Sequence, residues 1–140
     1  MEERDIAEAI ALVQEFHVEA LEVIGIYPDK EKLQQMARVF MSTSFVVVAD
    51  GKVVGTLVGF ITEYVGGTQA LYQEVMWFMN KRYRKYGIQL LRKVEEWCVE
   101  NGIFAIMMVG LGSAEGRLHD FFLRCGYKTL ETQYMKTLGV

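Results

Sequence analysis

The stretch Trp77-Phe-Met-Asn-Lys-Arg-Tyr-Arg-Lys-Tyr-Gly-Ile-Gln-Leu-Leu91 is the part of the chain around which the rest is organised. An apolar run of strand character ends at Met79, four basic residues follow between positions 81 and 85, and a helical pattern begins at Gly87. The first N–H groups of a helix lack intrahelical partners and carry the positive end of the helix dipole. With cations beside them, they predict a turn that binds phosphate oxygens. On charge alone, an ordinary solvated basic loop is the alternative.

The composition predicts one soluble intracellular domain covering residues 1–140, located in the cytoplasm. Hydrophobic residues make up 51% of the chain, which excludes a disordered protein. No apolar run reaches the roughly 18 residues of a membrane helix, and the N-terminal residues do not resemble a signal peptide. The two cysteines, Cys98 and Cys125, favour a reducing compartment over a disulfide scaffold. The net charge of −3 argues against general nucleic-acid binding, so the basic turn is a local exception.

Two helices are predicted before the first strand. Apolar residues recur at helical spacing from Asp5, a candidate N-cap, to about Val23. After a break at positions 25–29, a second helix is predicted from Lys30 to Met41.

Three strands follow, at residues 45–49, 53–65 and 70–79. The dipeptide Asp50-Gly51 predicts a two-residue hairpin turn between the first two strands. Gly55 and Gly59 in the second strand mark candidate bulges or close approaches of the backbone.

The third strand contains a single acidic residue in an otherwise apolar and aromatic interior. Period-two alternation places this residue, Glu74, on one face with Tyr72, Met76 and Phe78. Burial would raise the pKa of the carboxyl group toward neutrality, which suits a general base. The alternative is a structural carboxylate that is bonded to a turn or a nearby arginine, and both interpretations are open.

The remaining pattern predicts a helix from Gly87 to Asn101, a strand from Ile103 to Val109, a helix capped by Ser113 and closed by Gly126, and a final strand from Tyr127 to Leu138. A helix between two apolar strands implies a parallel pair with a right-handed crossover. The complete order is αα-βββ-α-β-α-β, a mixed α/β fold.

This order, with a basic turn before the third helix, resembles the GNAT superfamily of acyl-CoA-dependent N-acyltransferases, in particular its small bacterial and phage members. Leu90-Leu-Arg-Lys-Val-Glu-Glu-Trp97 on the following helix and Phe122-Leu-Arg-Cys-Gly-Tyr127 are similar to family segments. The resemblance implies a mostly antiparallel central sheet flanked by helices. The family's first strand is expected to be truncated, because the helical pattern begins almost at Met1.

The family's pyrophosphate loop, [Gln/Arg]-x-x-Gly-x-[Gly/Ala], aligns in two ways. The alignment Arg84-Lys-Tyr-Gly87-Ile-Gln89 keeps the first glycine but has Gln89 at the second position. The alignment Arg82-Tyr-Arg-Lys85-Tyr-Gly87 keeps the second glycine but has Lys85 at the first. The preceding residues favour the first alignment and the helix phase favours the second. Cofactor contacts are expected at Trp77, Phe78, Met79, Arg82, Arg84, Lys85, Tyr86, Gly87, Ile88 and Gln89.

The resemblance also implies a reaction in which an amine attacks the acyl-CoA thioester directly. Backbone N–H groups near Trp77 to Met79 would bind the developing oxyanion and the pantetheine amides. Glu74 lies where many relatives carry the base. Relatives commonly have a tyrosine four residues before the glycine that ends the fourth helix, and this chain has Phe122 there. Because a phenyl ring donates no proton, His119 or a water is expected to supply it.

The sequence therefore predicts an N-acetyltransferase that uses acetyl-CoA and a primary amine of a small molecule or peptide. The alternative is a catalytically silent module that binds CoA or a partner. A nucleic-acid-binding domain is a weaker third interpretation, and no membrane partner is expected; the prediction allows a homodimer. No metal is expected, because His17 and His119 lack ligand spacing.

Overall fold

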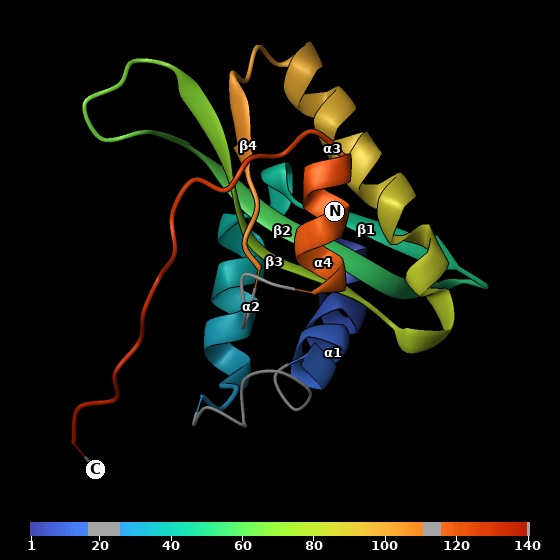
Figure 1. Ribbon diagram of the computed structural model, residues 1–140. Helices are drawn as coiled ribbons and strands as arrows, with labels where there is room; N and C mark the ends of the chain where they lie inside the picture. Colours follow the sequence, from blue (N-terminus) through green and yellow to red (C-terminus); the bar gives the residue numbers. More distant parts are fainter. Residues whose placement is uncertain (17–25, 111–115, 140) are drawn as a thin grey trace. The chain divides into compact units, whose positions relative to one another are not determined.

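The computed structural model describes residues 1–16, 26–110 and 116–139, in two compact units, Met1–Val109 and Gly110–Val140 (Figure 1). Counting described residues only, the first unit contains the sheet and three α-helices, and the second contains one α-helix. From the first helix to the fourth, the elements follow the predicted order. The predicted cap Ser113 and the predicted helical residues from His17 to Val23 lie outside the described residues.

Helix α1, Ile6–Phe16, follows a short 3-10 turn, η1, at Glu3–Asp5. The predicted N-cap role of Asp5 is wrong in detail, because Asp5 lies inside the 3-10 turn and Glu2 stands at the cap. The Asp5 carboxylate accepts a hydrogen bond from the Glu2 N–H at 2.8 Å, so it still satisfies a donor at the start of the helix.

Helix α2, Lys30–Val39, has Asp29 as its N-cap, whose carboxylate accepts a hydrogen bond from the Lys32 N–H at 3.0 Å. The helix ends slightly before the predicted Met41, because the chain tightens there into the 3-10 turn η4, Met41–Thr43.

The sheet has four strands in the order β1-β2-β3-β4: β1 Phe45–Ala49, β2 Lys52–Glu63, β3 Ala70–Met79 and β4 Ala105–Met107. Strands β1, β2 and β3 pair antiparallel, and β4 pairs parallel to β3, as predicted. The Asp50-Gly51 hairpin is confirmed, since both residues have positive φ angles, 51° and 73°. Strand β4 is shorter than the predicted 103–109.

A β-bulge interrupts the pairing of β2 with β3. Val58 lies opposite Met76, and its neighbour Gly59 lies opposite Glu74, so Val75 is an extra residue without a partner on β2. The bulge that the glycines of β2 indicated is therefore present at Gly59, and the inserted residue belongs to β3. An extra residue shifts the alternation of side chains along the bulged strand.

The predicted common face of Tyr72, Glu74, Met76 and Phe78 is wrong because of this bulge. The Tyr72 ring contacts Trp97 of α3 at 6.3 Å between centroids. The Phe78 ring instead contacts Phe16 of α1 at 5.6 Å, and Met76 packs into the α1–α2 core. Tyr72 therefore faces the α3 layer, whereas Met76 and Phe78 face the α1–α2 layer.

Gly59 allows the bulge to pack closely. A Cβ atom at this position would collide with the ring of Tyr72, which is completely buried. The Tyr72 hydroxyl donates a hydrogen bond to the Thr43 carbonyl at 2.6 Å, which fixes the ring in this place. A larger residue at position 59 would therefore displace a fixed core side chain.

Helix α3, Gly87–Glu100, covers the other face of the sheet from α1 and α2. Its residues that face the sheet are buried: Leu90, Leu91, Val94 and Cys98. The α1–α2 layer contributes Ile6, Ile10, Val13, Leu33 and Ala37 to the core.

The second unit contains helix α4, Arg117–Arg124, which ends at Gly126 with a φ of 89°, as predicted. Cys125, directly after this helix, is exposed. The predicted final strand is not observed, because residues 127–139 take part in no sheet of the described structure. The apolar residues of this segment do not alternate with a period of two, so no single face would be apolar. Among the described helices, none is long and apolar enough to cross a membrane.

Candidate active site

Glu74 lies where strands β3 and β4 separate. The pairing of the two strands ends at Gln73 opposite Met107, one residue before Glu74. Only 4% of the surface of Glu74 is exposed, and its Oε2 accepts a hydrogen bond from the Val109 N–H at 3.2 Å. This bond ties Glu74 to the chain that leaves β4.

The electrostatic state of Glu74 follows from this burial. Burial raises the pKa of the carboxyl group from 4.5 to about 8, and the hydrogen bond from Val109 offsets only part of the rise. Within the described part of the chain, no arginine or lysine forms an ion pair with it. Glu74 is therefore a carboxyl group that exchanges its proton near neutral pH, as the sequence predicted for a buried acid in this strand.

The edge of β3 beyond Glu74 has no strand partner. Strand β4 pairs only with Leu71, Tyr72 and Gln73, so residues 75–79 face a neighbouring strand only on the β2 side. In the described ranges, no other strand covers this edge. Backbone groups along this edge could pair with the amides of an extended ligand.

The basic turn begins directly at the end of β3. It forms a 3-10 helix, η5, over Lys81–Tyr86, and the Asn80 side chain caps it by accepting a hydrogen bond from the Arg82 N–H at 3.1 Å. Its four cationic side chains, Lys81, Arg82, Arg84 and Lys85, are all exposed.

The predicted bare helix start at Gly87 is wrong. The Gly87 N–H donates a hydrogen bond to the Arg84 carbonyl, because the 3-10 turn runs directly into α3. The cationic side chains of the turn are exposed to an anion, whereas the Gly87 N–H would first have to leave its present partner.

Gly87 has a packing role in addition. Its φ is an ordinary −59°, so it is not required for backbone conformation. A Cβ atom there would lie 3.4 Å from the Trp77 ring and 3.5 Å from Met79 Cγ. The glycine therefore lets the start of α3 approach β3 closely. As a result, three predicted cofactor residues lie close together: Trp77, Met79 and Gly87 itself.

The other predicted cofactor residues differ in whether their side chains are buried or exposed. Phe78 is buried against the α1–α2 layer, so only its backbone can serve the edge of β3. Ile88 and Gln89 are exposed on the first turn of α3, and the Lys85 ammonium lies 5.1 Å from the centroid of the Tyr86 ring.

One contact of the basic turn was missed by the sequence reasoning. The Tyr83 hydroxyl donates a hydrogen bond to Asp50 Oδ2 at 3.0 Å, which ties η5 to the β1–β2 hairpin. The two residues are 33 positions apart, and no local sequence signal links them.

The remaining predicted residues lie in the second unit. Phe122 contacts Tyr127 at 5.4 Å between ring centroids, and His119 is half-buried in α4. The proton-donor role of His119 stays a prediction. His17 lies outside the described residues, and no group of three or more metal-ligating side chains occurs within the described ones.

A sequence model of the acetyltransferase (GNAT) family matches residues 9–127. Because the match covers most of the chain, this protein belongs to the GNAT acetyltransferase family. No curated protein matches the chain at a significant level.

Solved structures of acetyltransferases share the fold. An acetyltransferase from Trypanosoma brucei is 17% identical with a TM-score of 0.71, covering 99% of this chain and 96% of that one. An aminoglycoside acetyltransferase from a soil metagenomic sample, in complex with sisomicin, is 20% identical with a TM-score of 0.67, covering 100% and 92%. A ribosomal-protein-alanine N-acetyltransferase from Brucella melitensis is 13% identical with a TM-score of 0.72, covering 99% and 95%.

Proposed function

We propose that this chain is an acyl-CoA-dependent N-acyltransferase that transfers an acetyl group from acetyl-CoA to a primary amine. The observation that supports this most is the position of Glu74. It is a buried carboxyl group with a pKa of about 8, at the point where β3 loses its partner strand and a few residues before the basic turn. The raised pKa and this position suit a general base, whereas the hydrogen bond from the Val109 N–H would also suit a structural carboxylate.

In the proposed reaction, Glu74 takes a proton from the attacking ammonium group, through a water molecule. The free amine then forms a bond to the acyl carbon, the carbon–sulfur bond breaks, and the thiolate takes up a proton. Backbone N–H groups on the edge of β3 would stabilise the negative charge on the acyl oxygen. When bound, acetyl-CoA supplies the activated thioester, and no step needs a metal.

The residues of the basic turn fit a diphosphate. Exposed guanidinium and ammonium groups from Lys81 to Lys85 provide charge-assisted hydrogen bonds to phosphate oxygens. The Tyr83–Asp50 hydrogen bond would hold the turn in place. The edge of β3 leads away from this turn toward Glu74, which is the path that an extended pantetheine arm would follow.

Calorimetric titration with acetyl-CoA is expected to show saturable binding that weakens at least about tenfold in Arg84→Ala, because a charge-assisted contact to phosphate is lost. Gly87→Asp is expected to weaken binding as well, since it adds a negative charge and crowds Trp77. Lys32→Ala, which removes an exposed charge on α2, is the control. Wild-type affinity in both site variants would place the diphosphate elsewhere.

A catalytically silent CoA-binding module is the second candidate function. Phe122 favours it, because the ring stands where relatives commonly have a proton-donating tyrosine. A thiol with a pKa near 8.5 is nevertheless a tolerable leaving group without help, so slow turnover is the expected behaviour.

Phe122→Tyr is expected to raise the turnover number, because a hydroxyl group would protonate the leaving thiolate. Release of free thiol, measured across a panel of amines, tests this. An unchanged rate would mean that thiolate departure is not limiting or that position 122 does not face the sulfur. If neither protein transfers an acetyl group while both bind acetyl-CoA, the silent module is correct.

The proposal includes a cytoplasmic location and a small-molecule or peptide amine as acceptor. Two of the solved neighbours act on an aminoglycoside and on a ribosomal-protein alanine, according to their names. An amine panel for this chain should therefore contain both aminoglycosides and peptides with a free N-terminus.

A further inference from the structure

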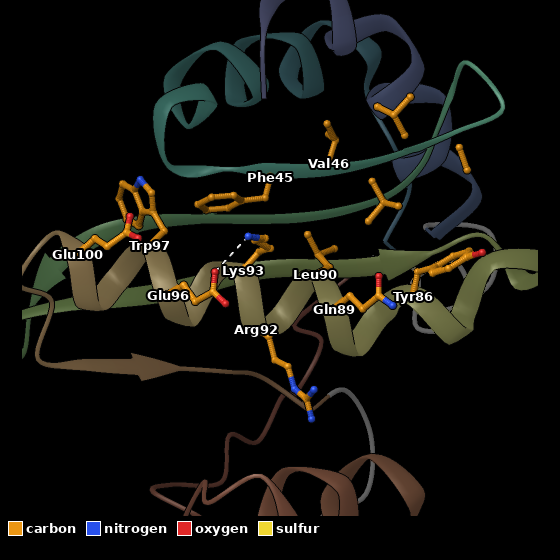
Figure 2. Close-up of a pocket in the computed structure, with 13 residues that line it drawn as sticks. Phe45, Val46, Tyr86, Gln89, Leu90, Arg92, Lys93, Glu96, Trp97 and Glu100 are labelled. Atoms are coloured by element: carbon orange, nitrogen blue, oxygen red, sulfur yellow. Dashed lines mark hydrogen bonds and ion pairs between the residues drawn. The ribbon is translucent and has the colours of Figure 1, made fainter.

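A groove lies between strand β1 and helix α3, away from Glu74. Its volume is about 840 Å³, and all five residues of β1 line one side of it (Figure 2). The apolar part of its lining includes Phe45, Leu90 and Trp97, with the Phe45 and Trp97 rings 5.6 Å apart. Among the described residues, none fills it.

Strand β1 is an edge of the sheet. Within residues 1–16, 26–110 and 116–139, it pairs with β2 alone, and its other side faces the groove. Its sequence, Phe-Val-Val-Val-Ala, contains no charged residue and no proline, although natural edge strands usually carry such residues to prevent pairing with other chains. Val48 on this strand is 57% exposed. An apolar edge without this protection favours pairing with another strand.

Five exposed polar residues of α3 line the groove; Arg92 is one of them, and the other four form a stripe. Gln89, Lys93, Glu96 and Glu100 follow each other at intervals of four, three and four residues, which places them on one face of the helix. Within the protomer, Lys93 Nζ and Glu96 Oε2 are 3.2 Å apart, in an exposed pair that contributes little stability.

This stripe is complementary to itself when it is read in the opposite direction. Two antiparallel copies of α3 place Lys93 beside Glu96 of the partner subunit, and Glu96 beside Lys93 of the partner subunit. The same arrangement places Gln89 beside Glu100 of the partner subunit. Every contact joins a carboxylate to an ammonium or an amide group, and no contact joins two like charges.

We propose that the groove is occupied by a second copy of this chain. The two β1 strands pair antiparallel about a two-fold axis, which extends the sheet through both subunits, and the two α3 helices lie side by side with their stripes in contact. A two-fold axis requires a self-complementary surface, and both the apolar edge and the α3 stripe satisfy this requirement. The interface is independent of the proposed function, although it would give Gln89 a role other than cofactor binding.

Sedimentation equilibrium over a wide range of protein concentration tests the proposal. The wild-type protein is expected to form a reversible dimer. Lys93→Glu and Glu96→Lys are each expected to weaken association at least about tenfold, because each brings like charges together at two symmetry-related contacts. An equimolar mixture of the two variants should recover a dimer, since every contact between unlike subunits again joins opposite charges.

Lys32→Glu makes the same charge change on α2, outside the groove, and is expected to leave the dimer intact. Hydrogen exchange of the amides of residues 45–49 should slow as the protein concentration rises, because pairing of β1 protects them. A wild-type monomer at all concentrations would overturn the proposal. Association as strong as that of the wild type in both charge variants would also overturn it. The same holds if the mixture of the variants stays monomeric, or if the exchange of the β1 amides does not depend on protein concentration.

Discussion

Glu74→Gln is expected to lower turnover roughly 10²–10⁴-fold while acetyl-CoA affinity stays unchanged. The amide has nearly the same size and can still accept a hydrogen bond from the Val109 N–H, so the junction of β3 and β4 should be preserved. It cannot, however, take a proton from the attacking ammonium group. Steady-state kinetics with the best amine of the panel, together with calorimetry, separates these two effects.

The pH dependence of kcat/KM gives the same prediction a second readout. For the wild-type protein, the rate should rise with pH and level off above about 8, because Glu74 must lose its proton to act as a base. This inflection should be absent from Glu74→Gln. Glu63→Gln, at the exposed end of β2, is the matched control and should behave like the wild type. Near-normal turnover of Glu74→Gln at neutral pH would make Glu74 a structural residue.

The elements around the site could be predicted from the sequence because their signals are local. The bounds of β3, the Asp50-Gly51 turn and the start of α3 at Gly87 are all confirmed. The burial of Glu74 was also predictable, since a single acid in an apolar strand follows its neighbours into the core.

The features that the sequence did not predict depend on tertiary contacts. The glycines of β2 indicated a bulge, but only the pairing of β3 with β2 shows that the extra residue is Val75 on β3. This extra residue reverses the predicted face of Met76 and Phe78. The 3-10 turn before α3 uses the Gly87 N–H that a sequence pattern would leave free. The Tyr83–Asp50 hydrogen bond joins distant segments.

The last predicted strand is the opposite case, because it was predicted but is not observed in the described structure. Residues 127–138 were predicted to complete the sheet after the fourth helix, although the apolar residues of this segment do not alternate with a period of two. The structure gives this segment no sheet pairing among the described residues. The place of this segment in the predicted order of elements therefore did not determine its structure, because a strand in this sheet also needs one apolar face.

The second large effect concerns stability. Glu74 has a pKa of about 8 in the folded protein against 4.5 as its usual value, so the folded state keeps a proton that the unfolded state releases. Between these two pH values, the free energy of unfolding should therefore fall as the pH rises, by roughly 1.4 kcal/mol per pH unit from this residue alone. Below this window both states hold the proton, and above it neither does, so the contribution is constant on each side.

Denaturant unfolding of the wild-type protein and Glu74→Gln at a series of pH values tests this expectation. The difference between the two free energies cancels the titration of other groups and leaves the contribution of Glu74, which should favour the variant increasingly up to about pH 8. A difference that does not vary with pH would mean that the carboxyl group is not held in its buried, proton-binding state. Because this measurement needs neither acetyl-CoA nor an amine, it separates the two parts of the proposal. A clear slope with unchanged turnover would establish a buried acid that is not the base, whereas a clear slope with lost turnover would identify the base that the reaction needs.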